Sequence, residues 1–152
     1  MPPEVKDPIL LHHPTRKSVG FFGAVRLRDG KFVFQKESGM FDRDSFWSFL
    51  KLLRKRSCHA GKQVVVLLDN AKYHHALLHK EWRRRCNHEF RCEYLPPYSP
   101  DLNPVERVWK LTRRICIHNR YFPKLSDIVT SVEDQFSLWT KESNELRKLC
   151  VI

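Results

Sequence analysis

Residues 63–70, QVVVLLDN, constrain the fold more than any other stretch of this 152-residue chain. Their apolar run, rich in β-branched residues, stops abruptly at Asp69. A continuous run of this kind is typical of a strand that is buried on both faces in a parallel sheet. The sequence therefore predicts an α/β fold with Asp69 at the carboxyl end of such a strand.

The next segment completes a strand–helix–strand unit. Residues 75–86 place Leu78 and Trp82 at helical spacing, and residues 90–95, FRCEYL, alternate as in a second, more exposed strand. Parallel strands joined by a right-handed crossover have their carboxyl ends on the same edge of the sheet. Because ligands of open α/β sheets bind at that edge, we expect the chain leaving Leu95 to pass close to Asp69.

A stiff segment, LPPYSPDLNPVERVW (95–109), then leads into a helix. Its prolines restrict the backbone, Asn103 is a favourable N-cap and Pro104 suits the first helical position. Glu106 lies off the apolar stripe of this helix, which consists of Val105, Val108, Trp109, Thr112, Ile115 and Cys116.

The flanking segments predict a hairpin and further helices. Residues 18–35 form an antiparallel hairpin that turns at Asp29-Gly30, with one face made by Val19, Phe21, Val25 and Leu27. A helix with Asp44 as N-cap packs on this hairpin and ends before Gly61; its apolar face is Phe46, Phe49, Leu50 and Leu53. Another helix starts at Ser126, with an inner face of Ile128, Val129, Val132, Phe136 and Trp139, and the tail to Ile152 adds a short third.

The charge balance predicts a polyanionic partner. The chain has 28 Lys and Arg against 17 Asp and Glu, a net charge of +11. Basic clusters at 54–56, 83–85 and 113–114 would attract phosphates without sequence preference. Each cluster also lies near a predicted helix C-terminus, where cations offset the macrodipole, so a solvated surface is the alternative interpretation.

Other features favour a cytosolic protein without a membrane partner. The longest uncharged apolar run, VVVLL, is far shorter than the roughly 20 residues that cross a bilayer, and the N-terminus lacks a signal-peptide core. Five cysteines without a CxxC pair indicate free thiols in a reducing compartment. Cys86 and Cys92 flank His88, but their irregular spacing favours ordinary thiols over a zinc site.

Two carboxylates stand out, and each has an ordinary structural alternative. Asp69 could simply cap the next helix, and Glu106 could bond back to its own N-cap and pair with Lys110. Together at one sheet edge of a basic protein, they suit a magnesium or manganese site that acts on phosphodiesters. His74 and His75 are interpreted as helix-entry or phosphate contacts rather than as zinc ligands.

The motifs LLDNAKYHH and YLPPYSPDLNPVERVWKLTRR closely resemble the catalytic core of mariner-like transposases of bacterial insertion sequences, which carry an Asp-Asp-Glu triad. The segment HPTRKSVGFFGAVRLRDGKFVF is similar to strands two and three of that family, so the likeness covers nearly residues 10–125. The resemblance implies a ribonuclease H-like mixed sheet with flanking helices. It also implies one DDE catalytic domain over residues 1–152, with a C-terminal helical segment at 126–152.

The resemblance assigns roles to particular residues. Asp69 matches the second catalytic aspartate and Glu106 the catalytic glutamate, with 36 residues between them, as in the family. Both would bind magnesium (or manganese) for in-line attack on a phosphodiester of double-stranded DNA. Lys72, Arg113 and Arg114 are predicted DNA-backbone contacts. A homodimer, association with a full-length transposase, and a place on the nucleoid when bound to DNA are further expectations.

The chain also departs from the family pattern. The family's first aspartate lies on a central first strand, and we expect this strand, its aspartate and the family's helix-turn-helix region to be missing here. Asp7 has no strand-like apolar run around it, Asp29 lies in a turn, and Asp42 and Asp44 lie at a helix start. An N-terminally incomplete domain with two of three carboxylates is expected to be inactive alone.

Three interpretations stay open. The chain is the C-terminal part of a transposase, either a degraded copy or the downstream frame of a frameshifted element. Alternatively, it is a non-catalytic DNA-binding remnant of a transposase. The third interpretation, an unrelated nuclease such as a ribonuclease H, fits the proline-rich motif poorly.

Overall fold

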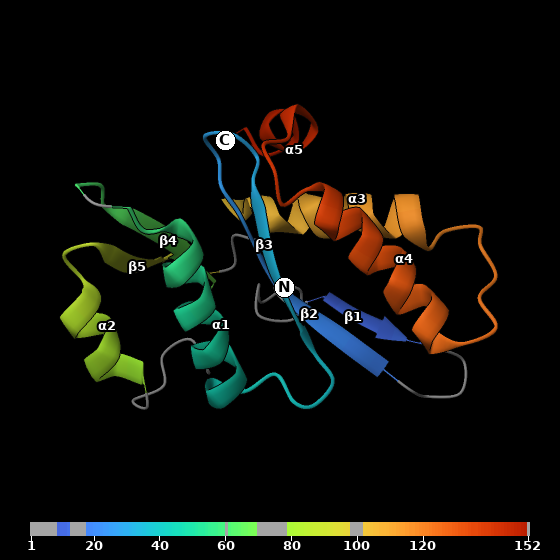
Figure 1. The fold of residues 1–152 in the computed structure, drawn as a ribbon, viewed down its shortest axis with the longest axis horizontal. Coiled ribbons are helices and arrows are strands. Elements are labelled where there is room, and N and C mark those ends of the chain that lie inside the picture. The colour runs from blue at the N-terminus through green and yellow to red at the C-terminus, as the bar shows by residue number, and fades with distance from the viewer. Residues whose placement is uncertain (1–8, 13–17, 60, 70–78, 98–101, 152) are drawn as a thin grey trace. The chain divides into compact units, whose positions relative to one another are not determined.

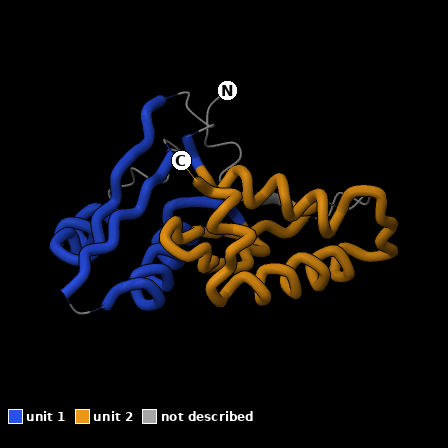
Figure 2. The backbone as a smooth tube through the Cα atoms, turned by 90° about the horizontal axis from the view of Figure 1, so that it is seen from above, with its two compact units in different colours: residues 1–7, 40–103 blue, residues 8–39, 104–152 orange. Residues whose placement is uncertain are grey.

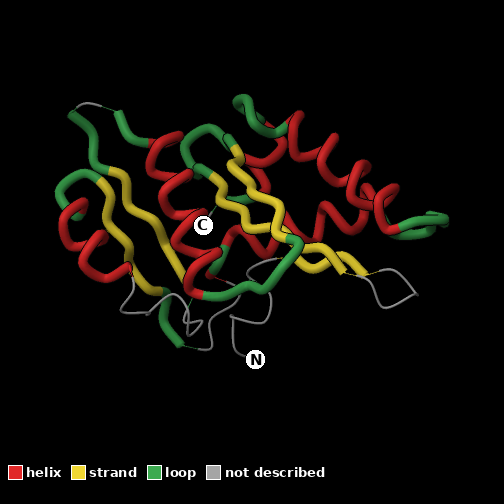
Figure 3. Tube along the Cα trace, turned by 60° about the horizontal axis from the view of Figure 1, so that its bottom comes forward, coloured by secondary structure: helices red, strands yellow, loops and turns green. Residues whose placement is uncertain are grey.

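The computed structural model describes residues 9–12, 18–59, 61–69, 79–97 and 102–151 (Figure 1). Two compact units share the chain: residues 1–7 and 40–103 form the first, and residues 8–39 and 104–152 form the second (Figure 2). Each unit is described by itself below. The predicted α/β class is confirmed, since small parallel and antiparallel sheets occur with flanking helices (Figure 3).

The first unit contains the predicted strand–helix–strand arrangement. Its elements are α1 (Arg43–Ser57), β4 (Val64–Leu68), α2 (Lys80–Cys86) and β5 (Phe90–Tyr94). β4 and β5 pair in parallel, with Val64 opposite Phe90 and Leu68 opposite Tyr94, as predicted. The start of the predicted helix, residues 75–78, lies outside the described residues.

Strand β4 is not buried on both faces, which corrects the prediction. Val65 and Leu67 are 43% and 41% exposed, whereas Leu68 is buried. Alternate side chains point to opposite faces of a strand, so one face of β4 is open to solvent. Helix α2 packs on the sheet through Trp82, whose ring meets that of Phe90 edge-on at 5.9 Å. An apolar run without alternation does not reveal whether a second layer covers the other face.

Helix α1 begins after Asp42 rather than after Asp44, so the predicted N-cap is wrong by two residues. An Asp42 carboxylate oxygen accepts hydrogen bonds from the N–H groups of Asp44 (3.1 Å) and Ser45 (3.0 Å). The Ser45 hydroxyl accepts in return from the Asp42 N–H (2.9 Å). This capping box fixes the start of the helix because Ser45 lies three residues after Asp42. The predicted apolar face of Phe46, Phe49, Leu50 and Leu53 is buried, while its packing on the hairpin stays a prediction.

The second unit contains a three-stranded antiparallel sheet of β1 (Ile9–His12), β2 (Ser18–Val25) and β3 (Phe32–Glu37), in that order. The predicted hairpin is β2–β3, and Arg26 and Lys31 close its turn with an N–H to carbonyl hydrogen bond of 2.8 Å. Leu27 lies in this turn and is 38% exposed, so its predicted place on the buried face is wrong. Strand β1 precedes the hairpin and pairs antiparallel with β2, which corrects the expectation that no strand lies upstream of the hairpin. The sequence analysis missed it because four residues are too few to display an alternating pattern.

Three helices accompany this sheet: α3 (Pro104–Cys116), α4 (Leu125–Leu138) and α5 (Asn144–Leu149). The predicted apolar faces of α3 and α4 are buried, except that Ile115 is only partly buried and Leu111 is buried in addition. Aromatic rings occupy the centre of the core. The Phe32 ring meets Trp109 edge-on at 5.7 Å and lies 5.0 Å from Phe136. None of the helices in the described ranges is long and apolar enough to span a membrane.

Two backbone hydrogen bonds join the hairpin to the C-terminal segment of this unit. The Phe32 N–H donates to the Trp139 carbonyl, and the Ser143 N–H donates to the Asp29 carbonyl, both at 2.9 Å. Gly30, in the turn, has a φ of 77°, and a β-carbon there would lie 2.2 Å from the Ser143 carbonyl oxygen. The hairpin turn and the start of α5 therefore depend on each other for their packing.

Candidate active-site carboxylates

Asp69 lies at the carboxyl end of β4 and is completely buried, with an exposed fraction of 0%. The preceding residue, Leu68, accepts a hydrogen bond of 2.7 Å from the N–H of Leu95, which follows β5. The chain that leaves β5 therefore starts beside Asp69, at the predicted edge of the parallel sheet. A buried carboxylate is stable only with polar or cationic neighbours, so this position suits a functional or structural partner.

Glu106 lies in the first turn of α3, between the buried residues Val105 and Val108, and is itself partly exposed. The turn that carries it is well fixed, because Asn103 and Pro104 are buried and the Cys150 thiol donates to the Pro104 carbonyl at 3.6 Å. Glu106 thus lies off the most buried stripe, as predicted. An acidic side chain in this turn is also favoured by the helix macrodipole.

Asp69 belongs to the first unit and Glu106 to the second, so their meeting at one metal site stays a prediction. Among the residues that the structure describes, no group of three or more His, Cys, Asp and Glu side chains could hold a metal ion. The donor type nevertheless fits a hard cation, since carboxylate oxygens are the ligands that magnesium and manganese prefer. Asp69 and Glu106 are the residues that would hold it.

The DNA contacts of Arg113, Arg114 and Lys72 stay predictions, and the structure describes the position of the two arginines only. Arg113 is partly buried and Arg114 exposed in the last turn of α3, where both also complement the macrodipole. Glu106, Lys110 and Arg113 are spaced four and three residues apart, so they share one face of the helix. Lys72, His74 and His75 lie outside the described residues.

The cysteines are free thiols, as predicted. Cys86 is buried at the end of α2, and burial raises the pKa of the Cys92 thiol to about 11.

Comparison with protein families identifies the family of this chain. A model of the DDE superfamily endonuclease family matches residues 3–129. The chain belongs to this family. Membership confirms the kinship inferred from the motifs around Asp69 and Glu106. Divalent metal chemistry is general to the DDE family, while the ion used here stays a prediction.

Two relatives are similar in sequence to parts of this chain. An uncharacterized protein, y4pE/y4sA of Sinorhizobium fredii (strain NBRC 101917 / NGR234), is 37% identical over 75 residues, which are 49% of this chain and 52% of the relative. An uncharacterized 39 kDa protein of the insertion element IS630, from Shigella sonnei, is 37% identical over 65 residues, 43% of this chain and 18% of the relative. The matches thus span about half or less of these relatives.

A solved structure confirms the fold. The crystal structure of the catalytic domain of Mos1 mariner transposase superposes with a TM-score of 0.73 at 14% identity. The match covers 95% of this chain and 72% of that domain. At this identity the likeness concerns the fold, which is the mixed α/β, ribonuclease H-like arrangement predicted from the sequence.

Proposed function

We propose that this chain is the catalytic part of a DNA transposase that cleaves and joins phosphodiesters at the ends of an insertion sequence. The observation that carries this proposal is the fully buried Asp69 at the carboxyl end of β4, directly beside the start of the Leu95 segment that leads to Glu106. The insertion-element relative and the mariner-like fold support the same activity.

In this proposal, Asp69 and Glu106 hold divalent magnesium or manganese. When bound, the metal lowers the pKa of the attacking water or 3′-hydroxyl and offsets charge on the leaving oxygen. Asp69 supplies a carboxylate fixed by the end of β4. Glu106 supplies a second one from a helix whose first turn is held by buried packing of Asn103 and Pro104.

Double-stranded DNA is the proposed partner. Exposed cations on α3, Lys110 and Arg114, together with the partly buried Arg113, would contact the phosphate backbone, and Lys72 is a further candidate. Association with another copy of the chain, or with a full-length transposase, is part of the same proposal. DNA bound in this way would keep the protein on the nucleoid.

A nicking assay with supercoiled plasmid and magnesium or manganese tests the proposal. If the family's first aspartate is missing from this chain, as the sequence analysis expects, the chain alone should bind duplex DNA weakly and leave the plasmid intact. Fusing an upstream segment that encodes a strand with an aspartate should restore nicking. Robust nicking by the chain alone would show that the triad is misplaced. Absence of both DNA binding and restored nicking would refute the proposal.

A non-catalytic, DNA-binding remnant is the second candidate. It is favoured by the net charge of +11, which suits binding to DNA phosphates without catalysis. This candidate predicts retained DNA binding with no nicking after fusion to any upstream segment.

A further inference from the structure

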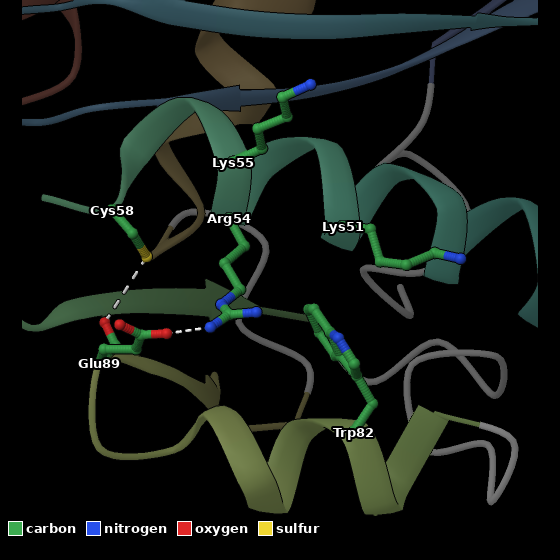
Figure 4. A pocket seen from close by; sticks show the side chains of 6 residues that line it. All are labelled: Lys51, Arg54, Lys55, Cys58, Trp82 and Glu89. Carbon is green, nitrogen blue, oxygen red and sulfur yellow. Dashed lines mark hydrogen bonds and ion pairs between the residues drawn. The ribbon is translucent and has the colours of Figure 1, made fainter.

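A basic pocket lies in the first unit, where α1 meets α2 and the start of β5 (Figure 4). Its volume is about 470 Å³, and it is lined by Lys51, Arg54, Lys55, Cys58, Trp82 and Glu89. The lysines and Arg54 come from the last turns of α1, and Trp82 comes from the basic helix α2. The folded chain therefore brings the basic end of α1 together with Trp82 and Glu89, which lie far later in the sequence.

An ion pair between Arg54 and Glu89 organises this pocket (Figure 4). The Arg54 guanidinium points toward Glu89, and its central carbon lies 6.0 Å from the Trp82 ring centroid. The Cys58 thiol donates to the Glu89 carbonyl at 3.8 Å, which also ties the end of α1 to this position. Arg54 lowers the pKa of Glu89 through its hydrogen bond, so the two charges neutralise each other at neutral pH.

Neither Lys51 nor Lys55 has a carboxylate partner among the described ion pairs. Lys51 and Lys55 are exposed and four residues apart on α1. In Figure 4 the Lys51 side chain runs along the helix, and the Lys55 side chain points away from Trp82. The Lys51 ammonium lies 4.5 Å from the Trp47 ring centroid, a contact that holds its position and leaves the charge uncompensated. A pocket with two exposed cations at its rim and one aromatic wall suits a nucleic-acid strand better than it suits an apolar ligand.

The pocket lies at the other end of the strands from Asp69. Glu89 immediately precedes β5, and its carbonyl accepts a hydrogen bond of 2.8 Å from the N–H of Val64, the first residue of β4. Asp69 follows the last residue of the same strand. Five residues of strand span about 16 Å, so the pocket is separate from the carboxylate edge.

We propose that this pocket is a second DNA contact of the chain, in which the exposed Lys51 and Lys55 at its rim bind backbone phosphates. The choice of DNA as the polyanion rests on the proposed function. The contact would hold a DNA segment away from the reacting phosphodiester and add affinity without sequence preference. The Arg54–Glu89 pair would serve as a fixed wall of the pocket.

Salt-dependent binding of a fluorescein-labelled 30-base-pair duplex tests the lysines. The variant K51A/K55A should reduce the slope of log affinity against log salt by about 1.8, because two phosphate contacts are lost. It should also weaken binding about 10- to 100-fold at 0.1 M salt. The matched control K141A/K148A removes two exposed lysines of the second unit and should change the slope little. Equal slopes for both double variants would overturn the proposal, as would tighter binding of a single-stranded RNA of the same length.

A charge-neutralising variant provides a test with the opposite sign. Glu89→Gln removes the partner of Arg54 and should make a third cation available, which steepens the slope by about 0.9 and tightens binding several-fold. The control Glu93→Gln removes an exposed carboxylate that pairs with Arg91 on β5, at 2.9 Å and outside the pocket. An equal gain in both variants would contradict the pocket, since it would reflect net charge alone. If wild type shows no duplex binding at any salt concentration, the proposed function fails as well.

Discussion

The backbone N–H of Leu95 donates a 2.7 Å hydrogen bond to the carbonyl of Leu68, one residue past the last paired position of β5. This bond belongs to the last pair of the parallel sheet, Leu68 opposite Tyr94, directly before Asp69. The proline-rich segment therefore leaves the sheet from a fixed point, and only the eight residues 96–103 connect it to the helix of Glu106.

The carboxylates themselves provide the first prediction. In the fused, nicking-competent protein, Asp69→Asn and Glu106→Gln should each abolish metal-dependent nicking, because the amides are poor ligands for a hard cation. Both replacements preserve shape, so the thermal midpoint of unfolding should change little. The control Glu81→Gln alters an exposed carboxylate that pairs with Arg84 on α2 and should leave nicking intact. Nicking by either active-site variant at the wild-type rate would contradict the assignment.

The start of α1 provides a prediction with an internal control. Asp42→Ala removes the side chain that accepts from the N–H groups of Asp44 and Ser45, and should lower the free energy of unfolding by about 1 kcal/mol. Asp44→Ala removes only an acidic residue of the first turn and should cost about 0.5 kcal/mol or less. Urea denaturation measures both. A larger loss for Asp44→Ala than for Asp42→Ala would place the cap where the sequence suggested.

The hairpin turn predicts a pH dependence of stability. Arg26 donates to both carboxylate oxygens of Asp29, at 2.8 and 2.5 Å, and lowers the pKa of this carboxyl to about 2. The unfolded value is near 3.9, so the pair stabilises the fold fully above about pH 4, and this contribution is lost as the pH falls through about 2.

Asp29→Asn should therefore lower the free energy of unfolding by about 1–2 kcal/mol at pH 7, after allowance for the partial exposure of both side chains. The difference from wild type should shrink between pH 4 and pH 2, as measured by denaturant titration at each pH. The control is Asp134→Asn on the exposed side of α4. A difference that stays constant across this range would rule out the ionised pair as its cause.

Close packing at Gly23 provides the last prediction. A β-carbon at this position of β2 would lie 2.3 Å from the Trp109 ring and 2.6 Å from the Phe32 ring. Gly23→Ala should therefore destabilise the second unit by about 1–3 kcal/mol, because both rings are part of a close-packed core. Gly39→Ala meets only the end of the Glu37 side chain, at 3.2 Å, and should have a small effect. Equal unfolding midpoints for the two variants would show that Trp109 can move away.

Much of the fold could be predicted because the signals are local. The spacing of apolar residues in α3 and α4, and the Asp29-Gly30 turn, depend on neighbours a few residues away. The prediction that β4 is buried on both faces was wrong. Burial of Val65 and Leu67 depends on whether another layer covers them, and the run VVVLL does not indicate whether such a layer exists. The pocket could not be predicted either, since the Arg54–Glu89 pair joins residues 35 positions apart through the folded backbone. The motif around Glu106 was recognisable from its length, whereas its approach to Asp69 is a property of the assembled chain.

The second unit is assembled from both ends of the chain, and this has a consequence for protein synthesis. Its sheet is complete by residue 39, but Trp109, Phe136 and the Trp139 carbonyl that meet Phe32 are added up to 100 residues later. Translation adds about 5–20 residues per second, so the apolar side of a newly made hairpin stays exposed for about 5–20 seconds before these residues can pack on it. The apolar side of the hairpin in a nascent chain is therefore covered only after residue 139 has been made.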